Sequence, residues 1–402
     1  MPSFGGSVIS GSRATDSILA QGLVPDRAIN VAQLEPNSAP LIQITTKTKG
    51  RKRRAINTTF EWFEDEPFPY WDAINYGSGY NSSATSVVVD NGGYFGSSNL
   101  VLIPRTGEIV RVTAVSTNTL TITRAAGGST AAAIVDNDDL RIIGSAHAEG
   151  ATAGTMKSTK KVRNYNYTQI FRDTFGATGT EEASELYWGN DRTMERKERG
   201  VDHALNIEAA FLFGQRNEDT TGSTPVRTTR GVINWITSNT EAIGGFLSED
   251  SWNSFLRDGF LHSSSQGKGS KWFFGSRVVV GAINAFSHEQ IRVVPKDKTY
   301  GISVQHYTSF FGDVLLMAHN LLENNPASNG TGTAAYGGYG ILMDPKSPSY
   351  RFLAANGKNR DTELRRNIQA NDADSWQDEY LSEVGLEYKQ ERWSRLMTGV
   401  TG

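Results

Sequence analysis

The sequence has no cysteine among its 402 residues, which excludes a disulfide framework, a thiolate nucleophile and a cysteine-ligated metal. It also lacks a long apolar run. A membrane-spanning helix needs about 20 such residues, and Val314–Met317 is among the longest apolar segments here. We therefore expect no contact with a membrane. Packing, together with assembly, must supply the stability that disulfides would otherwise give.

The charge balance and the start of the chain exclude further classes of protein. With 40 Lys and Arg against 43 Asp and Glu, the net charge of −3 gives no general reason for nucleic-acid binding. The N-terminal segment has no basic start followed by an apolar core. We therefore expect that the chain lacks a signal peptide and is synthesised in a cytoplasm. With 41 glycines, the length suits two or three domains with many turns and much β structure.

A long charged helix is predicted over Thr178–Phe213. A capping box marks its start, because Thr178 is followed three residues later by Glu181. Between Gly189 and Gly200 the segment has a single apolar residue. A helix that is polar on nearly every face bridges solvent or meets charged partners in other chains. One exposed helix, or two helices broken at Gly189 or Gly200, is the alternative.

The N-terminal part is predicted to be an extended arm. Residues 1 to about 40 show no periodic apolar face, so the arm is disordered or lies across a neighbour. The run Lys47–Arg54 then has six basic residues in eight. Nucleic-acid contact is one interpretation, but the run lacks interleaved aromatic residues. A solvated loop or a protein partner is favoured.

Two segments alternate as strands do. Phe60 and Trp62 fall on one face of Thr58–Glu64, and Arg163–Phe171 alternates in the same manner. We expect them to form the two antiparallel arms of a projecting hairpin.

Between these arms the sequence predicts a small barrel or sandwich. Its strands are short, β-branched and separated by turns. Val110, Val112 and Ala114 are expected on one face. The acidic run at 136–139 is predicted to be a polar turn, because the EF-hand pattern fails at its sixth and twelfth positions. The expected strands are Ser86–Asp90, Leu100–Ile103, Glu108–Val115, Thr119–Arg124 and Leu140–Ile143.

The second half of the chain mixes helices and strands without a regular βαβ repeat. A helix should begin after Ser248, which precedes apolar residues at helical spacing. A second helix is expected over Arg277–His288. The expected strands are Trp272–Gly275, Tyr300–Thr308, Asp313–His319, Tyr350–Leu353, Thr362–Gln369 and Tyr380–Gln390.

No motif indicates catalysis. The six histidines form no metal-ligand doublet, and residues 266–270 lack the GxxxxGK[ST] spacing of a phosphate loop. We therefore expect no catalytic, cofactor-binding or metal-binding residue, no cofactor and no enzyme. A carbohydrate-binding β protein with hydrolase activity remains an alternative, suggested by the aromatic and acidic residues.

The order of these parts resembles the major capsid (head) proteins of tailed bacteriophages, which have the Hong Kong 97-type fold. The resemblance is strongest in TTFEWFEDE at 58–66, in TLTITRAAGGSTAAAIVDNDDLRIIGSAHAEG at 119–150 and in NYTQIFRDTFGATGTEEA at 166–183. It points to a subgroup with a β-domain inserted in the extended loop. An encapsulin-like compartment of the same fold is an alternative.

The resemblance implies an α+β fold with four parts. These are an N-terminal arm at 1–55, an extended loop at 56–180 with an inserted β-domain at about 84–146, a peripheral domain with a spine helix at 181–215 and 346–402, and an axial domain at 216–345.

It also implies partners and a location. The chain would build hexamers and pentamers of an icosahedral shell, with the portal protein as a partner and scaffold or decoration proteins as further candidate partners. It would reside in the virion after assembly in the host cytoplasm, and would touch packaged double-stranded DNA only non-specifically. Reversing Arg196 and Arg199 to Glu is expected to leave a folded chain that assembles poorly. The candidate subunit-interface residues are Lys52, Arg53, Arg54, Trp62, Glu64, Glu195, Arg196 and Arg199.

Overall fold

The computed structural model describes residues 39–48, 50–152, 156–185, 191–264, 269–290, 294–295, 305–323 and 336–401. The predicted arm up to residue 38, most of the loop at 266–270 and the start of the strand predicted at Tyr300 lie outside these residues. The chain forms two compact units. Unit 1 is Met1–Glu61 with Tyr165–Gly402, and unit 2 is Trp62–Asn164. The predicted four-part domain boundaries stay predictions.

A six-stranded sheet forms one half of unit 1. Its main path is β1 (Lys52–Ala55), β19 (Pro348–Ala355), β22 (Ser375–Tyr388) and β10 (Gln169–Thr178). Two short strands join it: β20 (Lys358–Asn359) pairs with β19, and β21 (Glu363–Arg365) pairs with β22. β10 runs antiparallel to β22 over its whole length.

The basic run is only partly a loop. Its first residue, Lys47, ends helix α1 (Pro40–Lys47), and its last three residues begin β1, which pairs in parallel with β19. The prediction of a solvated loop is therefore wrong for Lys52–Arg54. The charged side chains of these residues stay exposed while their backbone joins the edge of the sheet.

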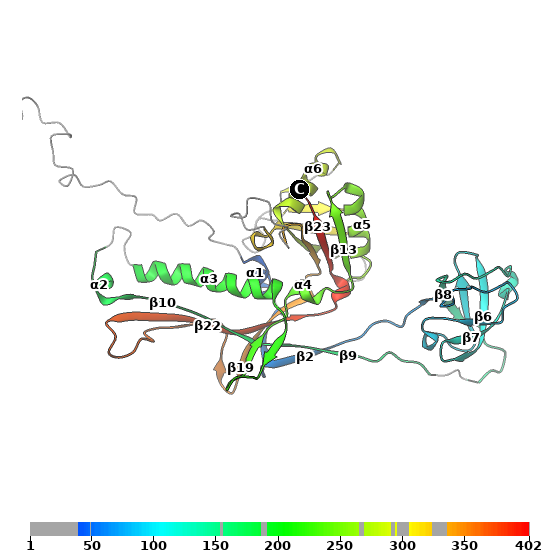
Figure 1. The fold of residues 1–402 in the computed structure, drawn as a ribbon, viewed down its shortest axis with the longest axis horizontal. Helices are drawn as coiled ribbons and strands as arrows, with labels where there is room; N and C mark the ends of the chain where they lie inside the picture. Colours follow the sequence, from blue (N-terminus) through cyan, green and yellow to red (C-terminus); the bar gives the residue numbers. More distant parts are fainter. Residues whose placement is uncertain are drawn as a thin grey trace, which may run out of the picture. The chain divides into compact units, whose positions relative to one another are not determined.

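The predicted long helix is two helices. Thr178 does cap a helix, since its Oγ accepts from the Glu181 amide at 3.3 Å, but α2 (Gly179–Glu182) lasts a single turn. The Ser184 hydroxyl then donates to the Thr180 carbonyl at 2.7 Å, a local bond that competes with helix continuation. The second helix, α3 (Asp191–Phe213), begins afterwards and lies along β10 and β22 (Figure 1).

Gly200, one of the two predicted break points, lies within α3 and does not break it, whereas Gly189, the other, lies outside the described residues. A Cβ at this position would come within 3.2 Å of the Tyr380 hydroxyl oxygen. That hydroxyl donates to the Arg196 carbonyl at 2.9 Å. Glycine therefore allows the helix to approach β22 closely.

Glu208 of α3 fastens α1 to the body. Its fully buried carboxylate accepts from the Leu41 and Ile42 amides at 2.7 and 2.8 Å, which are donors of the first turn of α1. His319 Nε2 lies 2.9 Å from the same carboxylate. Because the Leu321 amide donates to His319 Nδ1 at 3.2 Å, Nε2 carries the proton and donates to Glu208.

A seven-stranded sheet forms the other half of unit 1. Ser248 caps α5 (Glu249–Gly259) by accepting from the Ser251 amide at 3.2 Å, which confirms the predicted start. α6 (Arg277–Gln290) confirms the next predicted helix. The strands, in sheet order, are β13 (Thr240–Gly245), β23 (Arg395–Val400), β18 (Gly340–Met343), β14 (Lys271–Gly275), β17 (Asp313–Ala318), β16 (Gln305–Thr308) and β15 (Val294–Pro295).

The core of this half is aromatic. Trp252 packs on Phe255 and edge-on against Phe273, with ring centroids 5.8 and 5.0 Å apart. Short elements connect the two halves of unit 1: α4 (Val232–Trp235), β11 (Asn217–Asp219) and β12 (Val226–Thr228).

Lys271 is a buried cation at the end of this core. Its Nζ donates to the carbonyls of Gly259 at 2.6 Å, His262 at 2.8 Å and Trp393 at 2.6 Å. Burial lowers the pKa of Lys271 to about 8. One ammonium thus joins the end of α5 to the turn before β23.

Replacing Lys271 by Met should lower the free energy of unfolding by about 2 kcal/mol. The three buried carbonyls would lose their donor, and this destabilises the fold more than removal of the buried charge stabilises it. Wild-type stability should also rise as pH increases from about 8 towards the unfolded value near 10.4, since the unfolded chain retains the proton longer. Urea unfolding across this range should show the rise in wild type and in the exposed control Lys358→Met. An equal rise in Lys271→Met would contradict the assignment.

Unit 2 is a six-stranded β barrel. The strand order is β3 (Trp71–Ala73), β8 (Asp139–Ser145), β5 (Asn99–Ile103), β6 (Glu108–Ser116), β7 (Thr119–Thr123) and β4 (Ser86–Val88). An antiparallel bridge between Ile74 and Val89 connects the first and last strands, so the sheet closes. All five predicted strand segments are present; the three-residue β3 is additional.

The barrel departs from the sequence-based prediction at Ala114 and agrees with it at the acidic run. The register of β6 shifts between Val112 and Ala114, so Ala114 is exposed and its predicted place beside Val110 and Val112 is wrong. The acidic run forms the predicted turn, with Asn137 at φ 60° and Asp138 paired with Arg105 at 2.7 Å. Within the described residues, no group of three His, Cys, Asp or Glu is placed to hold a metal ion.

A separate two-stranded ladder joins β2 (Thr59–Glu64) to β9 (Val162–Tyr167). The pairing of the two predicted arms is confirmed, and Phe60 and Trp62 are buried as expected. The prediction of one strand over Arg163–Phe171 is wrong, because this segment belongs to two strands. It breaks at Thr168, whose amide donates to the Thr58 carbonyl at 2.8 Å, and β10 continues in another sheet. In the part of the chain that the structure describes, no helix is long and apolar enough to cross a membrane.

Candidate subunit-interface site

Part of the charge on α3 is paired within the chain. Asp378 of β22 is fully buried and accepts from Arg196 Nε at 2.7 Å, from Arg192 at 3.1 Å and from the Asn367 amide at 2.9 Å. Burial alone would raise the pKa of Asp378. The hydrogen bonds from Asn367, Arg196 and Arg192 outweigh it and hold the pKa below its ordinary value.

Two turns beyond Arg196, His203 fastens α3 to both neighbouring strands. Its Nδ1 lies 2.5 Å from Asp173 of β10, and its Nε2 lies 2.7 Å from the Ser382 hydroxyl of β22. Asn206 also donates to Asp173 at 3.0 Å. These contacts give His203 a structural role within the chain.

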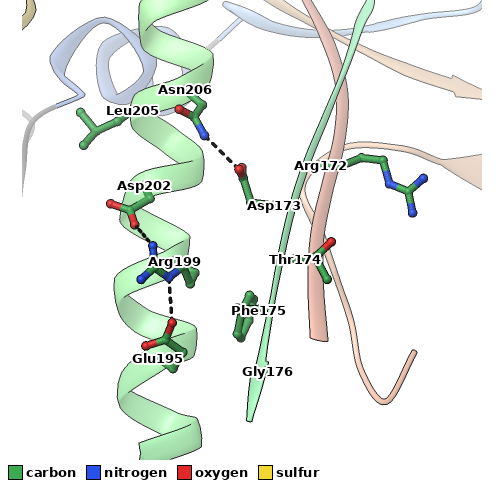
Figure 2. A pocket seen from close by; sticks show the side chains of 10 residues that line it. All are labelled: Arg172, Asp173, Thr174, Phe175, Gly176, Glu195, Arg199, Asp202, Leu205 and Asn206. Atoms are coloured by element: carbon green, nitrogen blue, oxygen red, sulfur yellow. Dashed lines mark hydrogen bonds and ion pairs between the residues drawn. The ribbon is translucent and has the colours of Figure 1, made fainter. Parts of the chain in front are cut away.

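A charged groove remains open between α3 and β10 (Figure 2). Its volume is about 640 Å³. On the helix side, Arg199 donates to Glu195 at 2.8 Å and to Asp202 at 2.7 Å, and the hydrogen bond to Glu195 raises the pKa of Arg199. The lining residues are Arg172, Asp173, Thr174, Phe175, Gly176, Glu195, Arg199, Asp202, Leu205 and Asn206.

The remaining predicted interface residues lie in two other places. On β1, Lys52 pairs with Asp361 and lies 5.4 Å from the centre of the Tyr350 ring. Arg53 donates to the Gly50 carbonyl at 2.9 Å, and Arg54 is exposed.

On β2, Trp62 Nε1 donates to Glu64 at 2.7 Å. The tryptophan is buried and the glutamate is half-buried. The polar edge of the indole is thus held on the ladder itself.

Of the predicted set, the structure brings Glu195 and Arg199 together on one wall of the groove. It also joins Trp62 to Glu64 on the ladder. Arg196 faces β22 instead. The opposite wall, with Arg172 and Asp173, was not predicted, because nothing in the sequence shows which helix a strand will face. An interface role for these residues stays a prediction.

Comparison with known proteins identifies the family to which the chain belongs. The family model of the SU10 major capsid protein matches residues 12–401. The major capsid protein of Pseudomonas phage PaMx41 is 26% identical over 294 residues, which are 70% of this chain and 68% of that protein.

Two solved structures are also similar. The capsid of a native GTA particle has a TM-score of 0.49 at 10% identity, covering 96% of this chain and 98% of that one. Microbacterium phage Oxtober96 has a TM-score of 0.48 at 9% identity, covering 94% and 96%.

The family match, which spans nearly the whole chain, defines the class: a major capsid protein of a bacteriophage, and thus a structural component of the virion. More narrowly, the chain belongs to the SU10 major capsid protein family. The capsid interpretation is favoured over an encapsulin-like compartment and over a carbohydrate-binding hydrolase.

Proposed function

We propose that this chain assembles with copies of itself into the icosahedral shell of a tailed bacteriophage. In this proposal the subunit has the Hong Kong 97-type fold, α3 is the spine helix, and the β2–β9 ladder is the extended loop that carries the inserted barrel. The protein acts as a building unit and catalyses no reaction.

The observation that carries self-assembly is the bare apolar surface of the ladder. Phe63 of β2 and Val162 of β9 are 68% and 59% exposed. An isolated two-stranded ladder is marginally stable in water. A ladder that shows large apolar side chains gains stability when a neighbouring subunit covers it.

Other partners follow from the same proposal. Portal, scaffold and decoration proteins would complete the particle in the host cytoplasm. The exposed cations of β1 would meet an adjacent subunit, and packaged DNA would interact only through its phosphate backbone, because the chain is acidic overall.

The double variant Phe63→Ser with Val162→Ser should remain folded but form far fewer particles, about tenfold fewer at a given protein concentration. Loss of two exposed apolar contacts weakens every copy of the interface at once. Negative-stain microscopy and sedimentation of the purified chain measure particle number. Circular dichroism checks the fold.

The matched control is Val135→Ser, an apolar residue of the barrel that is 46% exposed but lies outside the ladder. It should assemble as wild type does. Normal particles from the double variant would refute the ladder as an interface. A wild-type chain that stays a small compact species under all assembly conditions would refute the shell itself.

A further inference from the structure

Unit 2 contains a groove that no part of the capsid proposal explains. Its volume is about 530 Å³, within the range of ligand-binding pockets. It lies against the end of β8 and the segments that enter and leave the barrel. The lining residues are Phe68, Tyr70, Tyr94, Gly96, Ser97, Asn99, Ile142, Ile143, Gly144, Ser145, His147 and Lys157.

One wall of this groove is apolar and accessible. Tyr70 is 60% exposed and Ile143 is 46% exposed, while Phe68 and Tyr94 are half-buried. Tyrosine at such a position offers a flat apolar face and a polar tip, a combination that is enriched in binding surfaces.

The polar lining is cationic. No Asp or Glu is among the twelve lining residues, although the chain carries a net charge of −3. Lys157 Nζ donates to the Gly93 carbonyl at 2.9 Å and to the Phe95 carbonyl. An ammonium has three donors, so these two bonds fix it while one N–H remains to be directed to a ligand. Burial lowers the pKa of Lys157, a sign of incomplete hydration that an anionic ligand would relieve.

A second hollow continues the groove. Its volume is about 470 Å³, and it shares Phe68 and Lys157 with the first. Its lining adds Asp65 and Glu66. Lys157 thus lines both hollows, whereas the carboxylates of Asp65 and Glu66 line only the second.

We propose that this double groove binds an extended segment of a partner polypeptide. The segment presents a carboxylate beside an apolar side chain to Lys157 and Tyr70, and a lysine or arginine to Asp65 and Glu66. Charge complementarity sets the direction of the segment. A ligand that fills both hollows must carry an anionic and a cationic group, which favours a peptide over a compact small molecule.

This inference does not depend on shell assembly, because the groove lies wholly within unit 2. The test uses the full, unassembled chain and measures peptide binding by saturation-transfer NMR. The probes are the capped peptides acetyl-Leu-Glu-Ala-Ala-Lys-amide and acetyl-Leu-Gln-Ala-Ala-Lys-amide. 3-Phenylpropionate, which has a carboxylate and an apolar ring but no cationic group, serves as the small-molecule probe.

Wild type should bind the Glu peptide about tenfold more tightly than the Gln peptide, and Lys157→Met should abolish this difference. Tyr70→Ala, at an exposed position, should weaken both peptides with the fold intact. The control Lys160→Met changes an exposed lysine of the same segment that does not line the groove, and should bind as wild type does.

Three results would overturn the proposal. They are a wild type that does not distinguish the two peptides, a Lys160→Met variant that abolishes the difference as fully as Lys157→Met, and binding of 3-phenylpropionate as tight as that of the Glu peptide. The last result would show that the acidic hollow contributes nothing and that the ligand is a small molecule.

Discussion

Reversing Arg196 to Glu should destabilise the fold by about 3 kcal/mol, because it removes a donor from the buried Asp378 carboxylate and sets a second negative charge beside it. Arg192 and the Asn367 amide remain, which limits the loss. Urea unfolding of the unassembled chain gives the difference. The sequence-based expectation that the double reversal of Arg196 and Arg199 leaves a folded chain stays a prediction, and the pairing of Arg196 with Asp378 adds a loss of stability to it.

Arg199→Glu is the matched control on the same helix. Arg199 is 43% exposed and its ion pairs lie within α3, so its reversal should cost only about 1 kcal/mol. An assembly defect in this variant reports on the subunit interface, whereas a defect in Arg196→Glu reports on folding. Equal destabilisation of the two variants would contradict the role of Asp378.

The pH dependence gives an independent check. Because the folded-state pKa of Asp378 is depressed, its stabilisation is present above the unfolded value near 3.9 and is lost as pH falls through the folded value. Wild type should therefore lose stability more steeply below about pH 4 than Arg196→Glu does.

Replacing Glu208 by Ala should cost about 4 kcal/mol and should release α1. The change leaves the Leu41 and Ile42 amides and the His319 ring without their acceptor at a fully buried position, and it opens a cavity. Hydrogen exchange should become faster across residues 40–55, because α1 leads directly into β1. Denaturant unfolding should show the overall loss.

Glu208→Gln keeps the shape and one acceptor, so its cost should be about half as large. The control Glu182→Ala removes an exposed carboxylate that lies 3.7 Å from Arg192, and should change stability by less than about 1 kcal/mol. Unchanged protection of residues 40–55 in Glu208→Ala would show that α1 is held by other contacts.

Local patterns in the sequence predicted local structure well. The alternation of Phe60 and Trp62 identified β2, the hydroxyl of Ser248 identified the start of α5, and β-branched runs identified the barrel strands. Each of these signals lies within a few residues of the element that it predicts.

Features that depend on distant partners were not predictable. β22 is buried on both faces yet carries Asp378, Glu379, Glu383 and Glu387, each met by an arginine from another segment. From the sequence alone, these carboxylates indicate a strand with one exposed face, because the arginines that pair with them are distant in the chain. The break at Thr168 and the bulge before Ala114 likewise follow from strand pairing.

The candidate interface shows the same division. Glu195 and Arg199 are four residues apart, so helical geometry alone places both on one side of α3. The same spacing argument could not reveal that Arg196 turns towards Asp378, nor that Arg172 and Asp173 form the facing wall.

The bridge between Ile74 and Val89 has a consequence for how copies of the barrel can meet. It joins the first and last strands, where an open sheet would present free backbone groups to a neighbouring chain. Fusion of barrels strand by strand is therefore disfavoured, and contacts among copies are left to side chains, which choose partners more selectively.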